Sequence, residues 1–259
     1  MAKVKFKING KKVEAERGTY VLPLIQALGI YVPTLCYHPS VKPYGACRLC
    51  LIKVKDKRGR FKITTSCNYP AREGIEIFTD TKEVKRARKL IMEMLLAQAP
   101  GSEKLKEFAK KLGVKETTLI TANNTDKCII CGLCVSVCAE VIGLGCIAFE
   151  GKGINRKVVP PWNAPPDSCI GCGACAAVCP TGAITISDVD KYREINKIKV
   201  RLPLLKCSKC GKYFVVKKIY EKLKKSFEYM ENNDKFLAIC EECRRKLTAK
   251  NLIEHKKII

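Results

Sequence analysis

Histidine, tryptophan and acidic residues are scarce in this sequence, and it has no long apolar run. Its 259 residues include two His, one Trp and 25 Asp and Glu. The longest apolar candidate, residues 20–36, is interrupted by Pro23, Gln26, Gly29 and Pro33, whereas a membrane helix needs roughly 20 predominantly apolar residues. The first residues alternate charged with apolar side chains and contain no signal-peptide core. We therefore expect a cytoplasmic protein without a membrane span.

The motifs of the common enzyme classes are also missing. No Gly-rich phosphate loop follows a predicted strand, there is no Ser, His and Asp set, and the only two histidines are His38 and His255. The hydrophobic content of 47% excludes a disordered chain. The sequence thus predicts a folded protein with no substrate site of its own.

Cysteine, in contrast, is abundant. Sixteen of the 17 cysteines fall into four groups of four, and none lies between Asn68 and Lys127. In a reducing compartment, such grouping indicates metal sites rather than disulfides. The groups are Cys36, Cys47, Cys50 and Cys67; Cys128, Cys131, Cys134 and Cys138; Cys169, Cys172, Cys175 and Cys179; and Cys207, Cys210, Cys240 and Cys243.

The pattern of residues 1–80 predicts a small α+β domain. Asn9-Gly10, flanked by alternating apolar residues, is the pair that a two-residue hairpin turn prefers. A short helix is expected next, with Thr19 able to cap its start. A second hairpin with its turn at 57–59 and a last strand at 75–77 follow, so strands wrap around one helix.

Three further regions follow this domain. Residues 81–124 are predicted to be a helical connector, because 81–97 has helical periodicity and Pro100-Gly101 ends it. Residues 125–190 carry an internal repeat of the CxxCxxCxxxC type. Residues 191–259 are basic and have a CxxC motif at each end of a predicted helical segment, 219–230.

The CxxCxxCxxxC repeat is typical of two [4Fe-4S] clusters. Three cysteines of each run bind one cubane, and the fourth is presented to the other cluster. Zinc sites usually use two CxxC pairs instead, so we favour iron–sulfur clusters here. The first cluster is then predicted to bind Cys128, Cys131, Cys134 and Cys179, and the second Cys138, Cys169, Cys172 and Cys175.

The N-terminal group has one CxxC flanked by two distant cysteines. Plant-type [2Fe-2S] sites take three ligands from one long loop and a fourth from a later segment, and this group has the same arrangement. The gap between its first two cysteines, Cys36 and Cys47, is ten residues, whereas it is four in the plant pattern. His38 is interpreted as a loop residue beside the site, because four thiols already complete it.

The C-terminal group can arrange four thiolates tetrahedrally around one metal ion. Cys207, Cys210, Cys240 and Cys243 suit structural zinc, and a rubredoxin-like iron site would use the same ligands. We favour zinc, because the Cys207 motif and the helical insert resemble zinc ribbons. Cys146 is interpreted as a small buried apolar residue, and Trp162 as a residue that packs against the cluster domain.

Residues 125–187 resemble bacterial two-cluster ferredoxins, although Cys138 is not followed by proline and the gap before Cys169 is long. Gly45-Ala46-Cys47-Arg48-Leu49-Cys50, with the surroundings of Cys36 and Cys67, resembles the N-terminal [2Fe-2S] domain of the large iron–sulfur subunit of respiratory complex I and of diaphorase subunits of NAD-linked hydrogenases and formate dehydrogenases. The resemblance implies a β-grasp first domain whose [2Fe-2S] ligands are Cys36, Cys47, Cys50 and Cys67.

The same resemblance implies a function. We expect an electron-transfer subunit with one [2Fe-2S] cluster, two [4Fe-4S] clusters and one zinc. Its expected partners are a flavoprotein with FMN and the NAD(P) site, a small [2Fe-2S] subunit, and a hydrogenase or formate dehydrogenase catalytic subunit. The relatives commonly carry a further cluster with one His and three Cys after the connector, and residues 99–127 contain neither residue, so that cluster is expected to be absent.

The formal charge of +24 is reduced when the metal sites are filled. Loaded with clusters and zinc, the protein would carry about +16, because ligating thiols are deprotonated. The remaining excess suits docking on acidic partner subunits. A free multi-cluster ferredoxin and a basic nucleic-acid-binding iron–sulfur or zinc protein are the alternatives, and we rank nucleic acid last among the partners.

Overall fold

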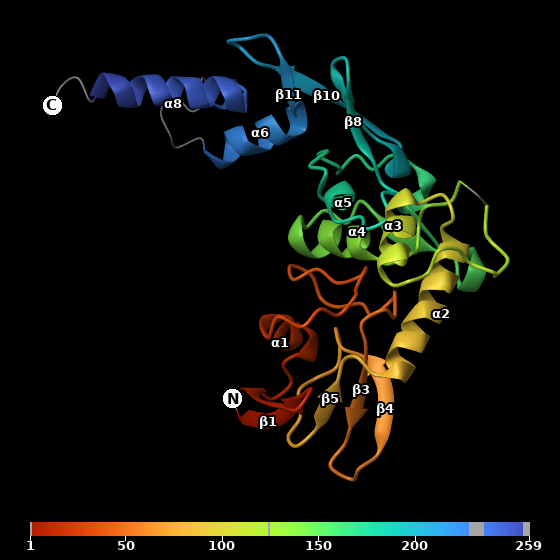
Figure 1. Cartoon of the computed structure of the whole chain (residues 1–259). Coiled ribbons are helices and arrows are strands. Elements are labelled where there is room, and N and C mark those ends of the chain that lie inside the picture. Colours follow the sequence, from red (N-terminus) through yellow and green to blue (C-terminus); the bar gives the residue numbers. More distant parts are fainter. Residues whose placement is uncertain (1, 124, 228–235, 256–259) are drawn as a thin grey trace.

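The structure is a computed structural model that describes residues 2–123, 125–227 and 236–255. The chain is mixed α and β, and its parts follow one another in space as they do in sequence (Figure 1). The N-terminal sheet lies at one end, the cysteine repeat lies in the middle, and the C-terminal helices lie at the other end. No helix within the described ranges is long and apolar enough to cross a membrane.

The first part is a five-stranded sheet with one helix packed on it. The strand order is β2-β1-β5-β3-β4; β1 pairs with β5 in parallel, and the other pairs are antiparallel. Asn9 and Gly10 form the first turn with positive φ angles of 46° and 82°, as the sequence predicts. The elements are β1 (Lys3–Ile8), β2 (Lys11–Glu16), α1 (Val21–Ala27), β3 (Leu51–Lys55), β4 (Phe61–Thr65) and β5 (Glu76–Phe78).

Helix α1 begins two residues later than Thr19, so the predicted Thr19 cap is wrong. Tyr20 takes the N-cap position, and no side chain caps the helix. Thr19 instead uses its backbone, because its carbonyl oxygen accepts a hydrogen bond from Ala71 N at 2.7 Å. The apolar face of α1, with Val21, Leu22 and Ile25, is buried on the sheet.

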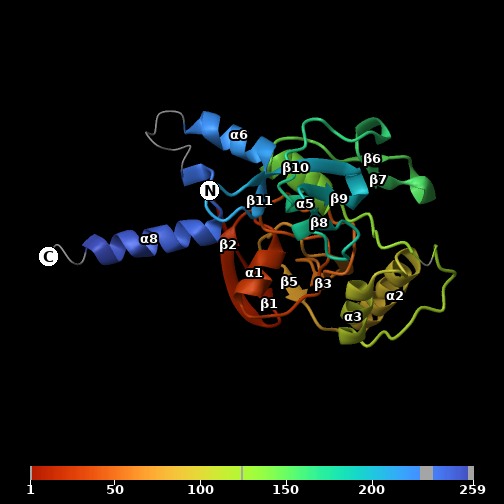
Figure 2. The same ribbon diagram turned by 90° about the horizontal axis from the view of Figure 1, so that it is seen from above.

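Two helices connect the first part to the cysteine repeat. The Thr81 side chain accepts a hydrogen bond from Val84 N at 3.3 Å and caps α2 (Lys82–Gln98). Ser102 caps α3 (Glu103–Lys111) in the same way and also donates to the Thr181 carbonyl oxygen at 2.8 Å. Figures 1 and 2 show α2 and α3 side by side. The buried hydrogen bond from Ser102 to Thr181 anchors the connector to the repeat.

The cysteine repeat supplies short helices, and a four-stranded antiparallel sheet packs beside it. The sheet order is β11-β10-β9-β8. Its strands lie on both sides of residue 190, the predicted boundary between the repeat and the C-terminal region. A separate hairpin, β6-β7, lies in the long gap of the repeat. The elements are α4 (Leu133–Ser136), a π-helical turn (Val137–Val141), β6 (Ala148–Glu150), β7 (Lys157–Val159), α5 (Ala174–Ala177), β8 (Ile186–Val189), β9 (Tyr192–Ile195), β10 (Val200–Lys206) and β11 (Tyr213–Val216).

The prediction that Trp162 packs against the cluster domain is wrong. Its side chain is 95% exposed. Trp162 follows Pro160-Pro161 in a short helical turn and has a φ of 53°, and this left-handed backbone turns the ring away from the interior.

The C-terminal helices project from the body of the molecule (Figure 2). Helix α6 (Lys217–Ser226) directly follows β11, and α8 (Glu241–His255) begins beside Cys240. The predicted helix over 219–230 therefore begins two residues earlier and ends at Ser226, and its positions 228–230 lie outside the described residues.

Candidate metal centres

The four cysteines of the first group lie together at one end of the five-stranded sheet. Cys36, Cys47 and Cys50 lie on the loop between α1 and β3, and Cys67 follows β4. Each is at most 2% exposed. Cys47 N donates a hydrogen bond to Cys36 Sγ at 3.3 Å. The thiols interact most strongly in two pairs, Cys36 with Cys47 and Cys50 with Cys67.

These pairs divide the four thiols into two that favour the thiolate and two that favour the thiol. The hydrogen bond from Cys47 lowers the pKa of Cys36 to about 7, and that from Cys67 lowers the pKa of Cys50 to about 6. The same bonds, together with burial, raise the pKa of Cys47 and Cys67. Thiolate is the metal-binding form of cysteine, so this donor set suits a buried iron–sulfur cluster.

Arg88 of α2 is buried beside this group, which no pattern in the sequence indicated. It is 7% exposed, and its Nη2 donates to the Leu51 carbonyl oxygen at 2.5 Å. Its Nε has no hydrogen-bond partner among the described residues. Burial lowers the pKa of Arg88, while the charges of Asp80 and Cys50 oppose that shift. A buried cation therefore faces the Cys50 side of the group.

We predict that Arg88→Met lowers the reduction potential of a [2Fe-2S] cluster held by this group. Reduction adds a negative charge, which a nearby cation stabilises. An interaction of about 1.4 kcal/mol corresponds to about 59 mV for one electron, so the fall is expected to be on the order of 50–100 mV. Potentiometric EPR titration measures it. Arg88→Lys keeps the charge and is the control; equal midpoints for Arg88→Met and the unmodified chain would contradict the prediction.

The first repeat contributes three cysteines to a small cavity, and the second repeat contributes the fourth. Cys128, Cys131, Cys134 and Cys179 all line it, together with apolar residues such as Ile129 and Ile184. Gly132, with a φ of 81°, is the N-cap of α4 and turns the chain between Cys131 and Cys134. A methyl group at Gly132 would lie 3.2 Å from Phe149 Cζ and 3.3 Å from Tyr44 Cδ1, so only glycine allows this close approach.

Backbone groups around Cys179 favour its thiolate. Burial raises the pKa of Cys179, but hydrogen bonds from Ile184, Thr181 and Ala183 outweigh burial, and the net pKa is lowered. Burial raises the pKa of Cys131 to about 12. Four thiols around an apolar cavity with N–H donors fit the requirements of a [4Fe-4S] cluster.

The second cavity is lined by the other predicted ligand set, in which the fourth cysteine again comes from the opposite repeat. Cys169, Cys172 and Cys175 come from the second repeat, and Cys138 comes from the first. Cys138 lies in the π-helical turn, whose extra residue changes the direction of the side chains that follow α4. Burial raises the pKa of Cys138 and of Cys175 to about 11. The structure thus brings together the two ligand sets that the spacing predicts.

The three sites form a continuous series. Cys36 and Cys47 share one apolar core with Ile129 and Cys131, and the charge of Cys47 contributes to raising the pKa of Cys131. Cys134 and Cys175 share the next core, and the Cys175 charge acts on Cys134. The first cavity therefore lies between the N-terminal group and the second cavity.

The C-terminal group has the geometry of a site for one ion. The Sγ atoms of Cys207, Cys210, Cys240 and Cys243 all lie within 4.8 Å of one another, and Cys210 Sγ lies 3.7 Å from Cys240 Sγ. A tetrahedral ion with metal–sulfur bonds of about 2.3 Å separates its sulfurs by about 3.8 Å. Hydrogen bonds from the N–H groups of Cys240, Cys210 and Lys209 outweigh burial and lower the pKa of Cys207 to about 6.

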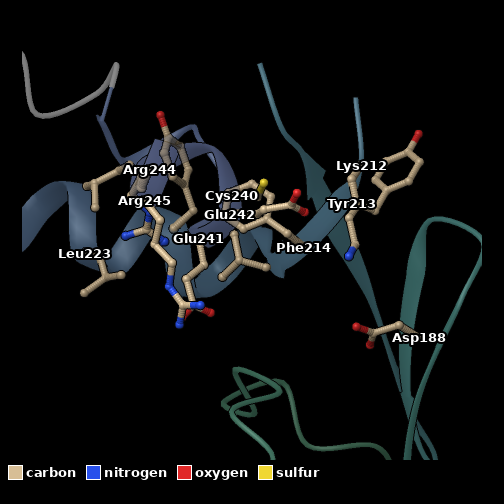
Figure 3. Close-up of a pocket in the computed structure, with 13 residues that line it drawn as sticks. Asp188, Lys212, Tyr213, Phe214, Leu223, Cys240, Glu241, Glu242, Arg244 and Arg245 are labelled. Atoms are coloured by element: carbon tan, nitrogen blue, oxygen red, sulfur yellow. The ribbon is translucent and has the colours of Figure 1, made fainter. Parts of the chain in front are cut away.

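A groove lies next to this group, between β11, α6 and α8. Figure 3 shows Phe214 of β11, Leu223 of α6 and Arg244 and Arg245 of α8 around it. Acidic Glu241 and Glu242 also line it, so the groove is of mixed charge. It offers no set of groups that would bind one class of ligand.

His38 lies on the loop of the first group and is tied to the backbone. Ser40 N donates a hydrogen bond to its Nδ1 at 3.2 Å. Cys146 is 2% exposed, as expected, but it lines the second cavity instead of an apolar core alone. No motif in the sequence marks Cys146, which lies on the loop between the π-helical turn and β6.

Comparison with known proteins identifies two iron–sulfur domains in this chain. A 2Fe-2S iron-sulfur cluster binding domain matches residues 1–82, and a 4Fe-4S dicluster domain matches residues 168–212. The 75 kDa subunit of NADH-ubiquinone oxidoreductase of Reclinomonas americana is 28% identical over 174 residues, which cover 58% of this chain and 25% of that one. The chain is homologous to this 75 kDa subunit.

Two further comparisons extend the relationship. NADPH-Fe(3+) oxidoreductase subunit alpha of Geobacter sulfurreducens is 30% identical over 173 residues, which cover 58% of this chain and 20% of that one. A chain in the crystal structure of NAD+-reducing [NiFe]-hydrogenase in the H2-reduced state is 27% identical, with a TM-score of 0.53 over 61% of this chain and 75% of that one. The chain spans about a fifth to a quarter of the length of the curated relatives that it matches.

Proposed function

We propose that the chain is an electron-transfer subunit of a cytoplasmic, multi-subunit NAD(P)-linked oxidoreductase of the hydrogenase or formate dehydrogenase type. It relays electrons between a flavoprotein subunit with FMN and the nicotinamide site and a terminal catalytic subunit, with a small [2Fe-2S] subunit as a further partner. The carrying observation is the continuous series of three four-cysteine sites. The homologues belong to NADPH-, NADH- and NAD+-linked enzymes, which supports the nicotinamide link.

Each of the three sites has a proposed cluster. One [2Fe-2S] cluster is held by Cys36, Cys47, Cys50 and Cys67, one [4Fe-4S] by Cys128, Cys131, Cys134 and Cys179, and the other by Cys138, Cys169, Cys172 and Cys175. The clusters supply one-electron chemistry when bound. The chain itself surrounds the sites with apolar side chains and directs N–H groups at ligand sulfurs, which stabilises thiolates.

We propose that the chain has four regions. Residues 1–80 form a β-grasp domain, supported by the mixed sheet with α1 across it. Residues 81–124 form the connector, and 125–190 form the two-cluster domain. Residues 191–259 form a zinc-ribbon-like region, although its strands β10 and β11 complete a sheet with β8 and β9.

Purification of the native protein under anaerobic conditions, with every accompanying chain identified, tests the function. We expect a nicotinamide flavoprotein together with a hydrogenase or formate dehydrogenase subunit. Recovery of this chain alone would instead favour a free multi-cluster ferredoxin. Retention on DNA or RNA at low salt that is lost at high salt would favour the nucleic-acid alternative.

We predict about ten irons and about one zinc per chain from these site types. The sulfur separations of the C-terminal group suit one tetrahedral ion. Elemental analysis of the anaerobic protein checks the prediction. About eleven irons without zinc would identify the C-terminal group as a rubredoxin-like iron site.

A further inference from the structure

The second cavity contains a fifth thiol. Cys146 lines it together with Cys138, Cys169, Cys172 and Cys175. Its side chain is 2% exposed, and it lies on the loop between the π-helical turn and β6. The four-cysteine assignment leaves this thiol without a role.

Contacts place Cys146 next to Cys138, one of the proposed ligands. The Cys146 thiol donates a hydrogen bond to the Leu144 carbonyl oxygen at 3.8 Å. The Cys146 backbone N donates to Cys138 Sγ at 3.2 Å. Ser168 Oγ lies 3.3 Å from Cys146 Sγ and makes a further polar contact. Cys146 thus lies beside the ligand that comes from the first repeat.

The first cavity has no such group. Its lining residues include Cys128, Cys131, Cys134 and Cys179 and no further cysteine within the described part of the chain. The neighbour of Cys179 is Thr181, whose Oγ1 lies 3.7 Å from Cys179 Sγ. The two cavities are therefore alike in their four predicted ligands but differ in the fifth position.

Backbone hydrogen bonds hold the loop that carries Cys146 over Cys138. Leu144 N and Gly145 N both donate to the Cys138 carbonyl oxygen, at 2.9 and 3.3 Å. Gly143 and Gly145 have φ angles of 77° and 60°, a backbone conformation that glycine adopts readily. The loop therefore keeps Cys146 at the second cavity beside Cys138.

We propose that Cys146 is a reserve ligand of the second [4Fe-4S] cluster. The inference rests on the proposed function, because it requires a cluster in this cavity. When Cys138 is absent, the Cys146 thiol gives its proton to solvent and its sulfur forms the one iron–sulfur bond that Cys138 would have made. No electron is exchanged in this substitution.

Iron content and EPR of the full chain, purified anaerobically, test the reserve role. Cys138→Ala is expected to keep about ten irons and a second-cluster signal with changed line shape. Cys138→Ala/Cys146→Ala is expected to lose that signal. Cys179→Ala is the matched control, since the first cavity has no spare thiol among its described lining residues, and it is expected to lose the first cluster. Equal iron loss in Cys138→Ala and in the double variant would overturn the reserve role.

Cys146→Ala alone keeps all four predicted ligands of the second cavity and does not depend on the folding of a ligand variant. It is expected to keep about ten irons and both [4Fe-4S] signals, because Cys138 is still present. Loss of the second cluster from Cys146→Ala alone would show that Cys146 is an ordinary ligand and would overturn the reserve role. If the unmodified chain itself holds no second [4Fe-4S] cluster, the proposed function fails, and that result is distinguishable because it precedes any substitution.

Discussion

A Cys50→Ser chain is expected to lose about two of its ten irons and the whole [2Fe-2S] EPR signal, with both [4Fe-4S] signals retained. Serine lacks the soft thiolate that iron–sulfur clusters require. Cys50 is 1% exposed and belongs to the core of the five-stranded sheet and α1, which contains no residue of the repeat. The loss should therefore stay within the first domain. Iron analysis and EPR of the reduced protein measure it.

Cys47→Ser is the informative comparison for this result. Cys47 is buried in the core that also contains Cys131 and Leu133, so a change there reaches the first cavity. We expect the same [2Fe-2S] loss, accompanied by a changed signal of the neighbouring [4Fe-4S] cluster. Disappearance of all cluster signals in Cys50→Ser would show that the two domains do not hold their clusters independently.

A Gly171→Ala chain is expected to be destabilised by about 2–5 kcal/mol and to release the second cluster at lower temperature. Gly171 has a φ of 68°, which costs an L-residue about 1–2 kcal/mol. The added methyl would lie 2.8 Å from Leu202 Cδ1 and 3.0 Å from Val216 Cγ2, and overpacking of this kind costs about 1–3 kcal/mol. The collision would separate β10 and β11 from the loop that carries Cys169 and Cys172.

Gly59→Ala is the matched control for this prediction. Gly59 also has a positive φ, 79°, but a methyl there would meet no atom within 4 Å. It should therefore lose only the backbone contribution, about 1–2 kcal/mol, and keep all clusters. Visible absorbance during anaerobic thermal unfolding compares the two. Equal midpoints for Gly171→Ala and Gly59→Ala would mean that the sheet does not pack on the second-cluster loop as described.

Local signals in the sequence predicted much of the fold. Asn9-Gly10 specified the first hairpin, because both residues accept positive φ. The helical periodicity over 81–97 predicted α2, and the structure shows that the Thr81 hydroxyl caps its start. The spacing of the two repeats was sufficient to predict which cysteines line each cavity. In this motif the fourth cysteine of each repeat is presented to the cluster of the other repeat.

Features that depend on contacts between distant parts of the chain could not be predicted from local sequence signals. Arg88 belongs to a helical pattern in the sequence, and only the packing of α2 on β3 shows that it is buried beside Cys50. Cys146 carries no motif, so its place in the second cavity depends on the course of the loop after the π-helical turn. The exposure of Trp162 depends on a left-handed backbone that no local residue preference indicated.

The proposed function requires electrons to pass through the three sites during nicotinamide oxidation or reduction. Freeze-quenched EPR of the native assembly after addition of NAD(P)H measures this passage. We expect the [2Fe-2S] and [4Fe-4S] signals of this chain to appear within one turnover, and Cys50→Ser assemblies to lose the first signal and turn over more slowly. Turnover at the full rate, with these clusters unreduced throughout, would contradict the electron-transfer role.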